Sequence, residues 1–154
     1  MSINKIRIPN SGLLKGSRQV GDLMAAQKDG LIQILSIKQS RQHSDSRIFT
    51  FMLCESEFIL LNEHRIKLNY ESYHIRIEYG GYTKPKVFIS SHNLERSCGH
   101  LNRDNTLCLY KTTDFIWKNT NSIAKDIVPL IYAWIYFYED WSKTKIWYGF
   151  SAKH

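Results

Sequence analysis

The chain has 154 residues, of which 43% are hydrophobic and 13% aromatic, and its formal net charge is +7. This composition excludes a disordered chain and predicts a single folded domain over residues 1–154. The basic residues stand singly rather than in runs, so a solvated basic surface or an acidic protein partner is favoured over nucleic acid binding.

The first predicted element is a helix from Ser17, a suitable N-cap, to about Lys28. Gly30 is predicted to end it, because glycine readily adopts the backbone conformation that closes a helix. Residues at helical spacing form one stripe that we expect to face the core. This stripe comprises Val20, Leu23, Met24 and Gln27.

Strands are predicted next. Leu31–Lys38 reads as a strand of unclear register, and residues 39–47 form a polar connection. Arg47–Cys54 is β-branched and aromatic enough to be a strand buried on both faces. The segment 58–70 is ambiguous, although alternate apolar side chains recur near its end.

The clearest strand is Tyr73–Tyr79, in which tyrosine and isoleucine side chains alternate with polar ones. Gly80 and Gly81 predict a turn after it. Lys86–Ser90 then returns as the partner strand. The two segments predict an antiparallel hairpin or meander.

A second amphipathic region follows, with Ser122 or Thr120 as its cap. Pro129 lies inside it and predicts either a kink or the start of another helix. The element order predicts an α+β fold: an antiparallel meander sheet with an N-terminal helix and C-terminal helices packed on one side. Apolar residues recur three and four positions apart: Ile123, Ile127, Leu130, Ile131, Trp134, Tyr138 and Trp141.

A polar loop between the last strand and this region ends in Leu107-Cys108-Leu109. If the tripeptide is extended, the leucines face the core and Cys108 faces a groove or the solvent. Arg103 and Lys111 would favour the thiolate, which is the nucleophilic form. This pattern indicates a reactive cysteine; the alternative is a small, buried apolar side chain.

Acyl transfer through a thiol needs a donor for the developing oxyanion and an acceptor that arrives with the partner. Asn102, Asn105 and the backbone N–H groups of the loop are the candidate donors. His100 is the nearest histidine in sequence, and it acts either as a base or as a brace for its loop. Trp117 lies just past the loop and is expected to wall the cysteine groove.

Other chemistries remain open. Zinc-type ligands are present at His92, Cys98, His100 and Cys108, but their spacing matches no regular zinc finger or ribbon. A cysteine hydrolase would pair Cys108 with His154 or His92, but it requires a cysteine at a helix N-terminus. A non-catalytic binding module with a packed cysteine is the third alternative.

The remaining cysteines and tryptophans have structural explanations. Cys54 and Cys98 are expected to be inert, and Trp134, Trp141 and Trp147 are expected to cover the core. No glycine-rich phosphate-binding loop is present, so no cofactor is predicted and the chain should not activate a carboxylate with ATP by itself.

The sequence also bears on the cellular compartment. Three cysteines with no Cys-x-x-Cys pair favour a reducing cytoplasm. The first nine residues contain no apolar stretch of signal-peptide length. The most apolar run, Ile127–Tyr138, is shorter than the ~20 residues needed to cross a bilayer, so no membrane partner is predicted.

From Tyr73 to His154, the chain resembles the ubiquitin-conjugating-enzyme family. The resemblance begins with the strands at 73–79 and 85–89. It continues at His100, Asn102, Cys108 and Trp117. The tail resembles the bacterial branch, the stand-alone conjugating-enzyme-like proteins of short type II CBASS antiphage operons. The matching tail residues are Trp134-Ile135, Tyr138–Trp141, Thr144, Trp147–Gly149 and His154.

This resemblance implies a ubiquitin-conjugating-enzyme-like fold and an acyl transferase in which Cys108 holds a partner's C-terminal glycyl group as a thioester. His100, Asn102 and Trp117 are the implied supporting residues. The implied partner is the operon's cyclic-oligonucleotide synthase, a nucleotidyltransferase, with a separate activating enzyme as a further candidate. The chain has His100-Leu101-Asn102 where the eukaryotic family has His-Pro-Asn, and its stretch from Asn102 to the cysteine is shorter.

Overall fold

The computed structural model describes residues 18–39, 46–54, 73–81, 83–111 and 114–149, together with the backbone of 56–60 and 64–68. Its elements, in chain order, are α1 (Arg18–Lys28), β1 (Ile32–Gln39), β2 (Arg47–Leu53), β3 (Ser56–Leu60), β4 (His64–Leu68), β5 (His74–Tyr79), β6 (Lys86–Ile89), the 3₁₀ turn η1 (Arg96–Cys98), the π-helical turn η2 (Ile123–Ile127) and α2 (Val128–Thr144).

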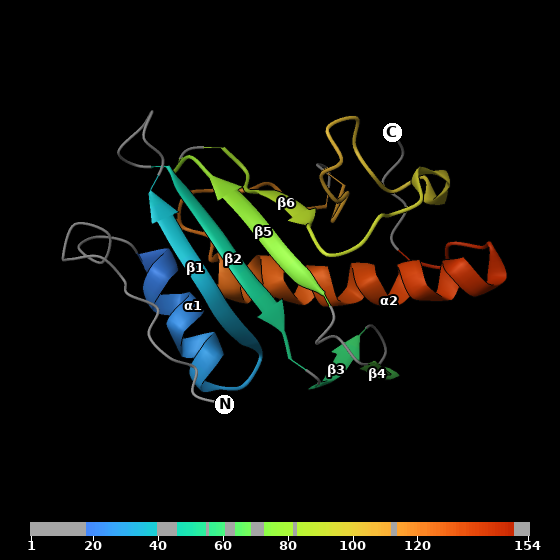
Figure 1. Cartoon of the computed structure of the whole chain (residues 1–154), viewed down its shortest axis with the longest axis horizontal. Coiled ribbons are helices and arrows are strands. Elements are labelled where there is room, and N and C mark those ends of the chain that lie inside the picture. The colour runs from blue at the N-terminus through green and yellow to red at the C-terminus, as the bar shows by residue number, and fades with distance from the viewer. Residues whose placement is uncertain are drawn as a thin grey trace.

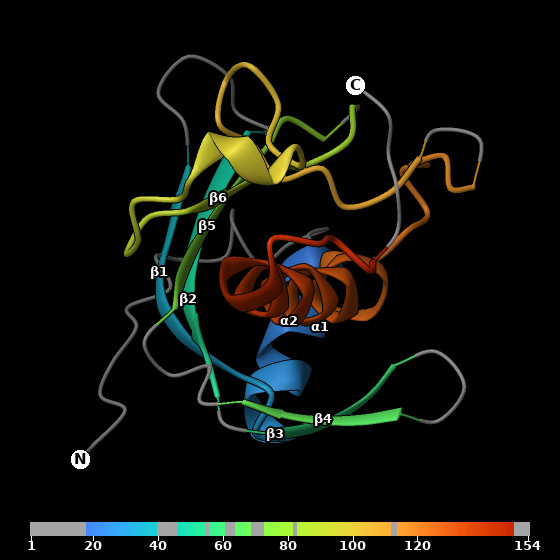
Figure 2. The ribbon, with the colours of Figure 1, turned by 90° about the vertical axis from the view of Figure 1, so that its right-hand side faces the viewer.

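The main sheet has the strand order β1-β2-β5-β6, and every neighbouring pair is antiparallel (Figure 1). Strands β3 and β4 form a separate hairpin between β2 and β5 in sequence. Both long helices lie on the same face of the main sheet (Figure 2). The predicted α+β meander with helices on one side is therefore confirmed.

Helix α1 begins and ends close to the predicted residues, and Gly30 follows it with a φ of +79°. Its buried row runs through Val20, Leu23 and Ala26. The prediction that Met24 belongs to this face is wrong, because its side chain is 41% exposed. The buried residues, which are three positions apart, pack against β1 and η2, and Met24 lies beside this row on the helix surface. Ser17, the predicted cap, lies outside the described residues.

Strand β1 contains a bulge between Ile34 and Ser36, which explains why the simple alternation gave no clear register. Before the bulge Ile32 and Ile34 are buried, and after it Ile37 is buried. In β2, the alternate residues Phe49, Phe51 and Leu53 are buried, whereas those between them are half-buried. The expectation of equal burial on both faces of β2 is thus wrong, because the helices cover one face of the sheet.

The strand predicted at 73–79 is present as β5, and its tyrosine and isoleucine side chains are buried. It pairs with β6 in the register Ile75↔Ile89 and Ile77↔Val87, so the predicted antiparallel partner is confirmed. The ambiguous segment at 58–70 falls largely within the β3–β4 hairpin.

The C-terminal region starts with the Ser122 hydroxyl, which accepts a hydrogen bond from the Lys125 N–H and thereby caps η2. Helix α2 begins at Val128, with Pro129 in its first turn, where a missing N–H is tolerated. Of the two predictions for Pro129, the start of another helix is confirmed. No described helix is long and apolar enough to cross a membrane.

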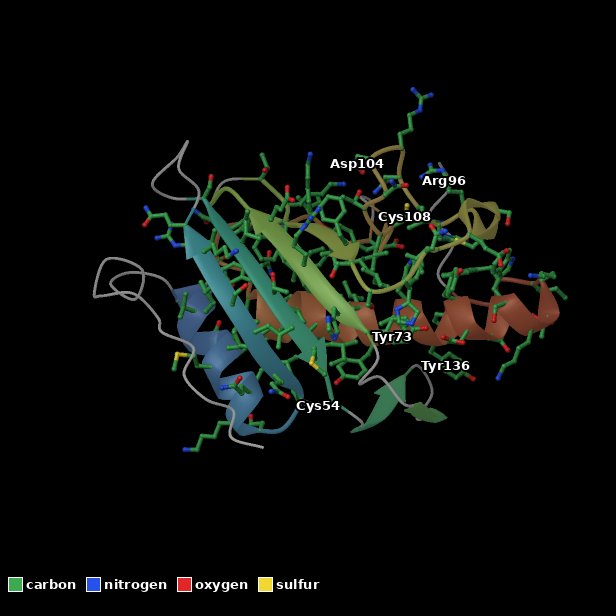
Figure 3. The ribbon with its side chains drawn as sticks, in the orientation of Figure 1. Cys54, Tyr73, Arg96, Asp104, Cys108 and Tyr136 are labelled. Atoms are coloured by element: carbon green, nitrogen blue, oxygen red, sulfur yellow. The ribbon has the colours of Figure 1, made fainter. Side chains whose placement is uncertain are left out.

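The core lies between the sheet and the two helices. Tyr132 of α2 is 1% exposed, and its hydroxyl donates to the carbonyl oxygens of Leu31 (2.6 Å) and Cys54 (2.9 Å). A single helix side chain thus ties the start of β1 to the end of β2. This contact fixes α2 against the sheet, and α2 in turn supports the cysteine loop on the far side of the molecule (Figure 3).

Candidate active site around Cys108

The loop that carries Cys108 folds back on itself between β6 and η2. Leu101 and Leu107 form an antiparallel bridge, and the Cys108 N–H donates to the His100 carbonyl at 3.1 Å. Asn105 makes the turn with a φ of +69°. The Leu107 N–H donates to the Val87 carbonyl at 2.9 Å, which attaches this hairpin to β6. The sheet edge therefore fixes the position of Cys108.

Leu107 and Leu109 are buried, as predicted, but the Cys108 side chain is only 8% exposed. Of the two predicted settings for this thiol, a groove or the solvent, the solvent-facing one is wrong. Because residues 100–108 pair with each other, the face opposite the two leucines is covered by the Asn102 side of the hairpin. The Cys108 thiol donates to the Asn102 side-chain oxygen Oδ1 at 3.2 Å.

The surroundings of Cys108 disfavour its charged form. Burial is the largest influence, followed by the Cys98 thiol, and together they raise the pKa of Cys108 to about 11. Lys84 and Arg96 oppose this shift. The prediction that neighbouring cations hold the thiolate is therefore wrong for this state. The cations that act on the sulfur belong to residues brought in by the fold, not to the sequence neighbours Arg103 and Lys111.

Asn102 reaches the sulfur despite the short spacing, but it presents its oxygen rather than its amide hydrogens. Its Nδ2 donates to the Thr106 hydroxyl at 2.9 Å, and that hydroxyl donates to Asp104 Oδ1 at 2.6 Å. The Thr106 N–H donates to the same Asp104 oxygen at 3.1 Å. These Thr106 hydrogen bonds lower the pKa of Asp104. In this state Asn102 is an acceptor for the thiol and not an oxyanion donor.

Asn105, the other candidate side-chain donor, is engaged with Arg96. The Arg96 guanidinium donates to Asn105 Oδ1, and it also donates to the Asn102 carbonyl oxygen at 3.1 Å. Arg96 and Asp104 lie on either side of Cys108, on the side of the molecule opposite the β3–β4 hairpin (Figure 3). The Arg96 guanidinium thus bridges two residues of the hairpin turn.

His100 supports this loop through its backbone and its ring. Its carbonyl accepts from the Cys108 N–H and from Trp134 Nε1, the latter at 3.1 Å. Its ring is 8% exposed and stacks on Trp147 with centroids 4.0 Å apart. These contacts favour the brace over the general base for His100.

The remaining aromatic and cysteine residues of the prediction have contacts of their own. Trp117 packs edge-on against Tyr79 at the end of β5, with ring centroids 5.5 Å apart. Cys98 is buried in η1, and burial raises the pKa of its thiol. Cys54 lies at the opposite side of the molecule from Cys108 (Figure 3).

The geometry disfavours the hydrolase. Cys108 lies in a hairpin and not at a helix N-terminus. His92 stacks on Tyr73, which lies away from Cys108 (Figure 3). His154 is outside the described residues. Within the described part of the chain, no three metal-ligating side chains come together.

Sequence reasoning missed Asp104, Thr106, Arg96 and Lys84. An Asp-x-Thr segment in a polar loop often forms a turn in which the carboxylate accepts from the backbone N–H two residues on. The contact between Asp104 and Thr106 could therefore have been predicted from the sequence. Arg96 and Lys84 had none, because the tertiary fold brings them to the sulfur.

Comparison with known proteins places this arrangement in context. No curated protein sequence matches the chain significantly. A family model described as type II CBASS E2 protein matches residues 37–154. The matched range includes the end of β1, the other three strands of the main sheet, the cysteine hairpin and α2. The fold and the antiphage family that the resemblance implied are thereby confirmed. The chain belongs to the family of type II CBASS E2 proteins.

Proposed function

We propose that Cys108 forms a thioester with the C-terminal acyl group of a partner protein, and that the partner is the cyclic-oligonucleotide synthase of a CBASS operon. Membership of the E2 family supports an acyl-transfer role in antiphage defence. The observation that carries the assignment to Cys108 is its contact with Asn102 inside a hairpin anchored to both β6 and α2.

The proposed reaction has two steps. First, the Cys108 sulfur attacks the carbonyl carbon of an acyl group activated as an adenylate or thioester on a separate enzyme. The carbon–sulfur bond forms, the bond to the activating group breaks, and the thiol proton leaves with that group. In the second step an amine nitrogen attacks the thioester carbonyl carbon and the carbon–nitrogen bond forms. The carbon–sulfur bond breaks, and the proton lost by the amine restores the Cys108 thiol. The acylation primes or regulates the synthase, and it takes place in the cytoplasm, where thiols stay reduced.

The buried thiol sets a requirement for the first step. At neutral pH a thiol with a pKa of about 11 is almost entirely protonated. The activated acyl group must therefore be positioned so that the proton leaves as the carbon–sulfur bond forms. Lys84 and Arg96 supply positive charge near the sulfur that favours this step.

The test is co-expression of the chain with its genomic neighbours, followed by a search for a larger species that reductant or hydroxylamine removes. The wild type, Cys54→Ala and Cys98→Ala should form it, and Cys108→Ala should not. Cys108→Ser should trap an oxyester that resists reductant. An adduct that persists in Cys108→Ala would contradict the assignment.

A non-catalytic binding module is the second candidate, and the low exposure of Cys108 is the observation that favours it. In that case, the chain and the synthase would associate without any covalent species, and Cys108→Ala would bind as tightly as the wild type. Denaturing electrophoresis of the purified complex separates the two outcomes.

A further inference from the structure

Three hydrogen bonds connect Cys108 to the carboxylate of Asp104. They run from the thiol to Asn102 Oδ1, from Asn102 Nδ2 to the Thr106 hydroxyl, and from that hydroxyl to Asp104 Oδ1. Thr106 is 6% exposed, so water does not replace it easily in this chain. Asp104 is exposed and lies 3.6 Å from the Lys86 ammonium group.

In this state the three hydrogen bonds run in one direction. A carboxylate can only accept hydrogen bonds, so the single hydroxyl proton of Thr106 is committed to Asp104. The Thr106 oxygen then accepts from Asn102 Nδ2, which leaves Asn102 Oδ1 facing the sulfur. An oxygen in that position binds the protonated thiol and repels the thiolate. The ionised Asp104 carboxylate therefore favours the protonated form of Cys108 through the side chains of Thr106 and Asn102.

The same groups allow a second arrangement. If Thr106 turns its hydroxyl proton to Asn102 Oδ1, the carboxamide can turn over and present Nδ2 to the sulfur side. The Thr106 N–H still donates to Asp104 in that arrangement, so the turn of the hairpin is retained. Only rotations about side-chain bonds are needed, and no proton or bond is gained or lost.

We propose that Asp104 and Thr106 are positioning residues that set the direction of the Asn102 carboxamide. In the resting state the carboxamide oxygen keeps the Cys108 thiol protonated. Binding of the acyl donor rotates the carboxamide, so that its N–H group becomes an oxyanion donor. This inference rests on the proposed function, because it takes Cys108 as the nucleophile. It explains how the same Asn102 restrains the resting thiol and stabilises the developing oxyanion during transfer.

Charged and titratable groups of three segments act on Cys108. Cys98 and Arg96 come from η1, Lys84 from the segment before β6, and Asp104 from the hairpin itself. A test must therefore separate the hydrogen-bond chain from the charge of Asp104. Thr106→Val removes the connecting hydroxyl but keeps the charge. Asp104→Asn removes the charge but keeps an acceptor oxygen.

The experiment measures the rate of iodoacetamide alkylation at Cys108 in the full chain, by peptide mass spectrometry, from neutral pH to about pH 11, where the wild-type thiol titrates. Thr106→Val should lower the pH at which Cys108 titrates and should raise the alkylation rate near pH 8 by about tenfold, the effect of one pKa unit. This difference should narrow as the pH approaches about 11, because the wild-type thiol then ionises as well. Thr106→Ser keeps the hydroxyl and should match the wild type. Thermal melting verifies that each variant is folded.

Two outcomes would overturn the proposal. The first is a wild-type profile in Thr106→Val, and a titration shifted only in Asp104→Asn would then mean that the charge acts alone. The second is a rate that Thr106→Val raises by the same factor at every pH up to about pH 11, which indicates a loosened loop and not a changed titration. Alkylation needs no partner. A missing synthase adduct would therefore contradict the proposed function but would leave the alkylation result for Thr106→Val unchanged.

Discussion

At the scale of single residues, the sulfur of Cys108 is subject to opposing influences. Burial, the Cys98 thiol and the Asn102 oxygen favour the protonated form, whereas Lys84 and Arg96 favour the thiolate. Burial dominates, so the resting thiol is weakly nucleophilic. Reactivity must then be supplied by the arrival of an already activated acyl group.

This balance predicts an unusual pH profile for Cys108 alkylation. Because the folded pKa is raised to about 11, the thiolate fraction should still rise about tenfold per pH unit between pH 8 and pH 10. An unperturbed thiol levels off above its pKa of ~8.5. Site-resolved alkylation of the native chain checks this, with the urea-unfolded chain as control. A plateau near pH 9 in the native chain would contradict the raised pKa.

Asn102→Ala should separate resting reactivity from transfer. Loss of the oxygen that faces the thiol should leave alkylation unchanged or faster. Loss of the oxyanion donor should slow acyl transfer by about a hundredfold or more. Single-turnover transfer and alkylation are measured on the same preparation. If both rates fall in proportion to thermal stability, Asn102 only shapes the turn.

At the scale of elements, the cysteine hairpin depends on neighbours that the sequence places far away. The Leu107 N–H donates to the backbone of β6, and the His100 carbonyl accepts a hydrogen bond from the Trp134 indole N–H of α2. The anchoring of α2 therefore matters for the position of Cys108. That anchoring includes the Tyr132 hydroxyl, which bonds to the Leu31 and Cys54 carbonyls beside the start of β1 and the end of β2.

Tyr132→Phe should lower the free energy of unfolding by about 1–3 kcal/mol, because it removes the part-buried hydroxyl that bonds to the Leu31 and Cys54 carbonyls and accepts from the Cys54 N–H. Tyr136→Phe is the matched control on the same helix. Its half-buried ring contacts Phe137, and the change should stay within about 0.5 kcal/mol. Urea unfolding of both variants gives the comparison. Equal losses in the two variants would contradict the role assigned to the Tyr132 hydroxyl.

The elements that were predicted from sequence share a local cause. Strand β5 follows strict alternation, and Gly30 and Ser122 mark helix ends through their own backbone and hydroxyl chemistry. The bulge in β1 broke the alternation, and the exposure of Met24 depends on how α1 lies against the sheet. Such features arise from packing between elements, which a local pattern does not encode.

The same division holds for the candidate site. The position of Cys108 in the loop and its neighbour Asn102 were readable from the motif. The burial of the sulfur and the contributions of Lys84 and Arg96 were not, because they depend on the hairpin folding against β6 and on the approach of η1.

At the scale of the whole molecule, the Cys108 site lies on the side opposite the β3–β4 hairpin and is attached to β6, the edge strand of the four-stranded sheet (Figure 3). Under the proposed function, the partner must bring a flexible tail to Cys108, which is 8% exposed. Glycine-like residues at the end of such a tail allow the closest backbone approach.

Changing the tail of the synthase should therefore prevent adduct formation. Removal of the last residue, or replacement of a terminal glycine by a bulky residue, should abolish the reductant-sensitive species on co-expression. The control is the same bulky substitution outside the tail, which should leave the adduct intact. Equal adduct formation with the truncated synthase would contradict recognition of the C-terminus.

The most direct measurement is peptide mass spectrometry of the adduct purified without reductant. Digestion should yield one cross-linked peptide that joins Cys108 to the final residue of the synthase, with the mass of the two peptides less one water. Neutral hydroxylamine should cleave it and leave a free thiol on Cys108. A cross-link to Cys98 or Cys54, or a disulfide to the partner, would contradict the account.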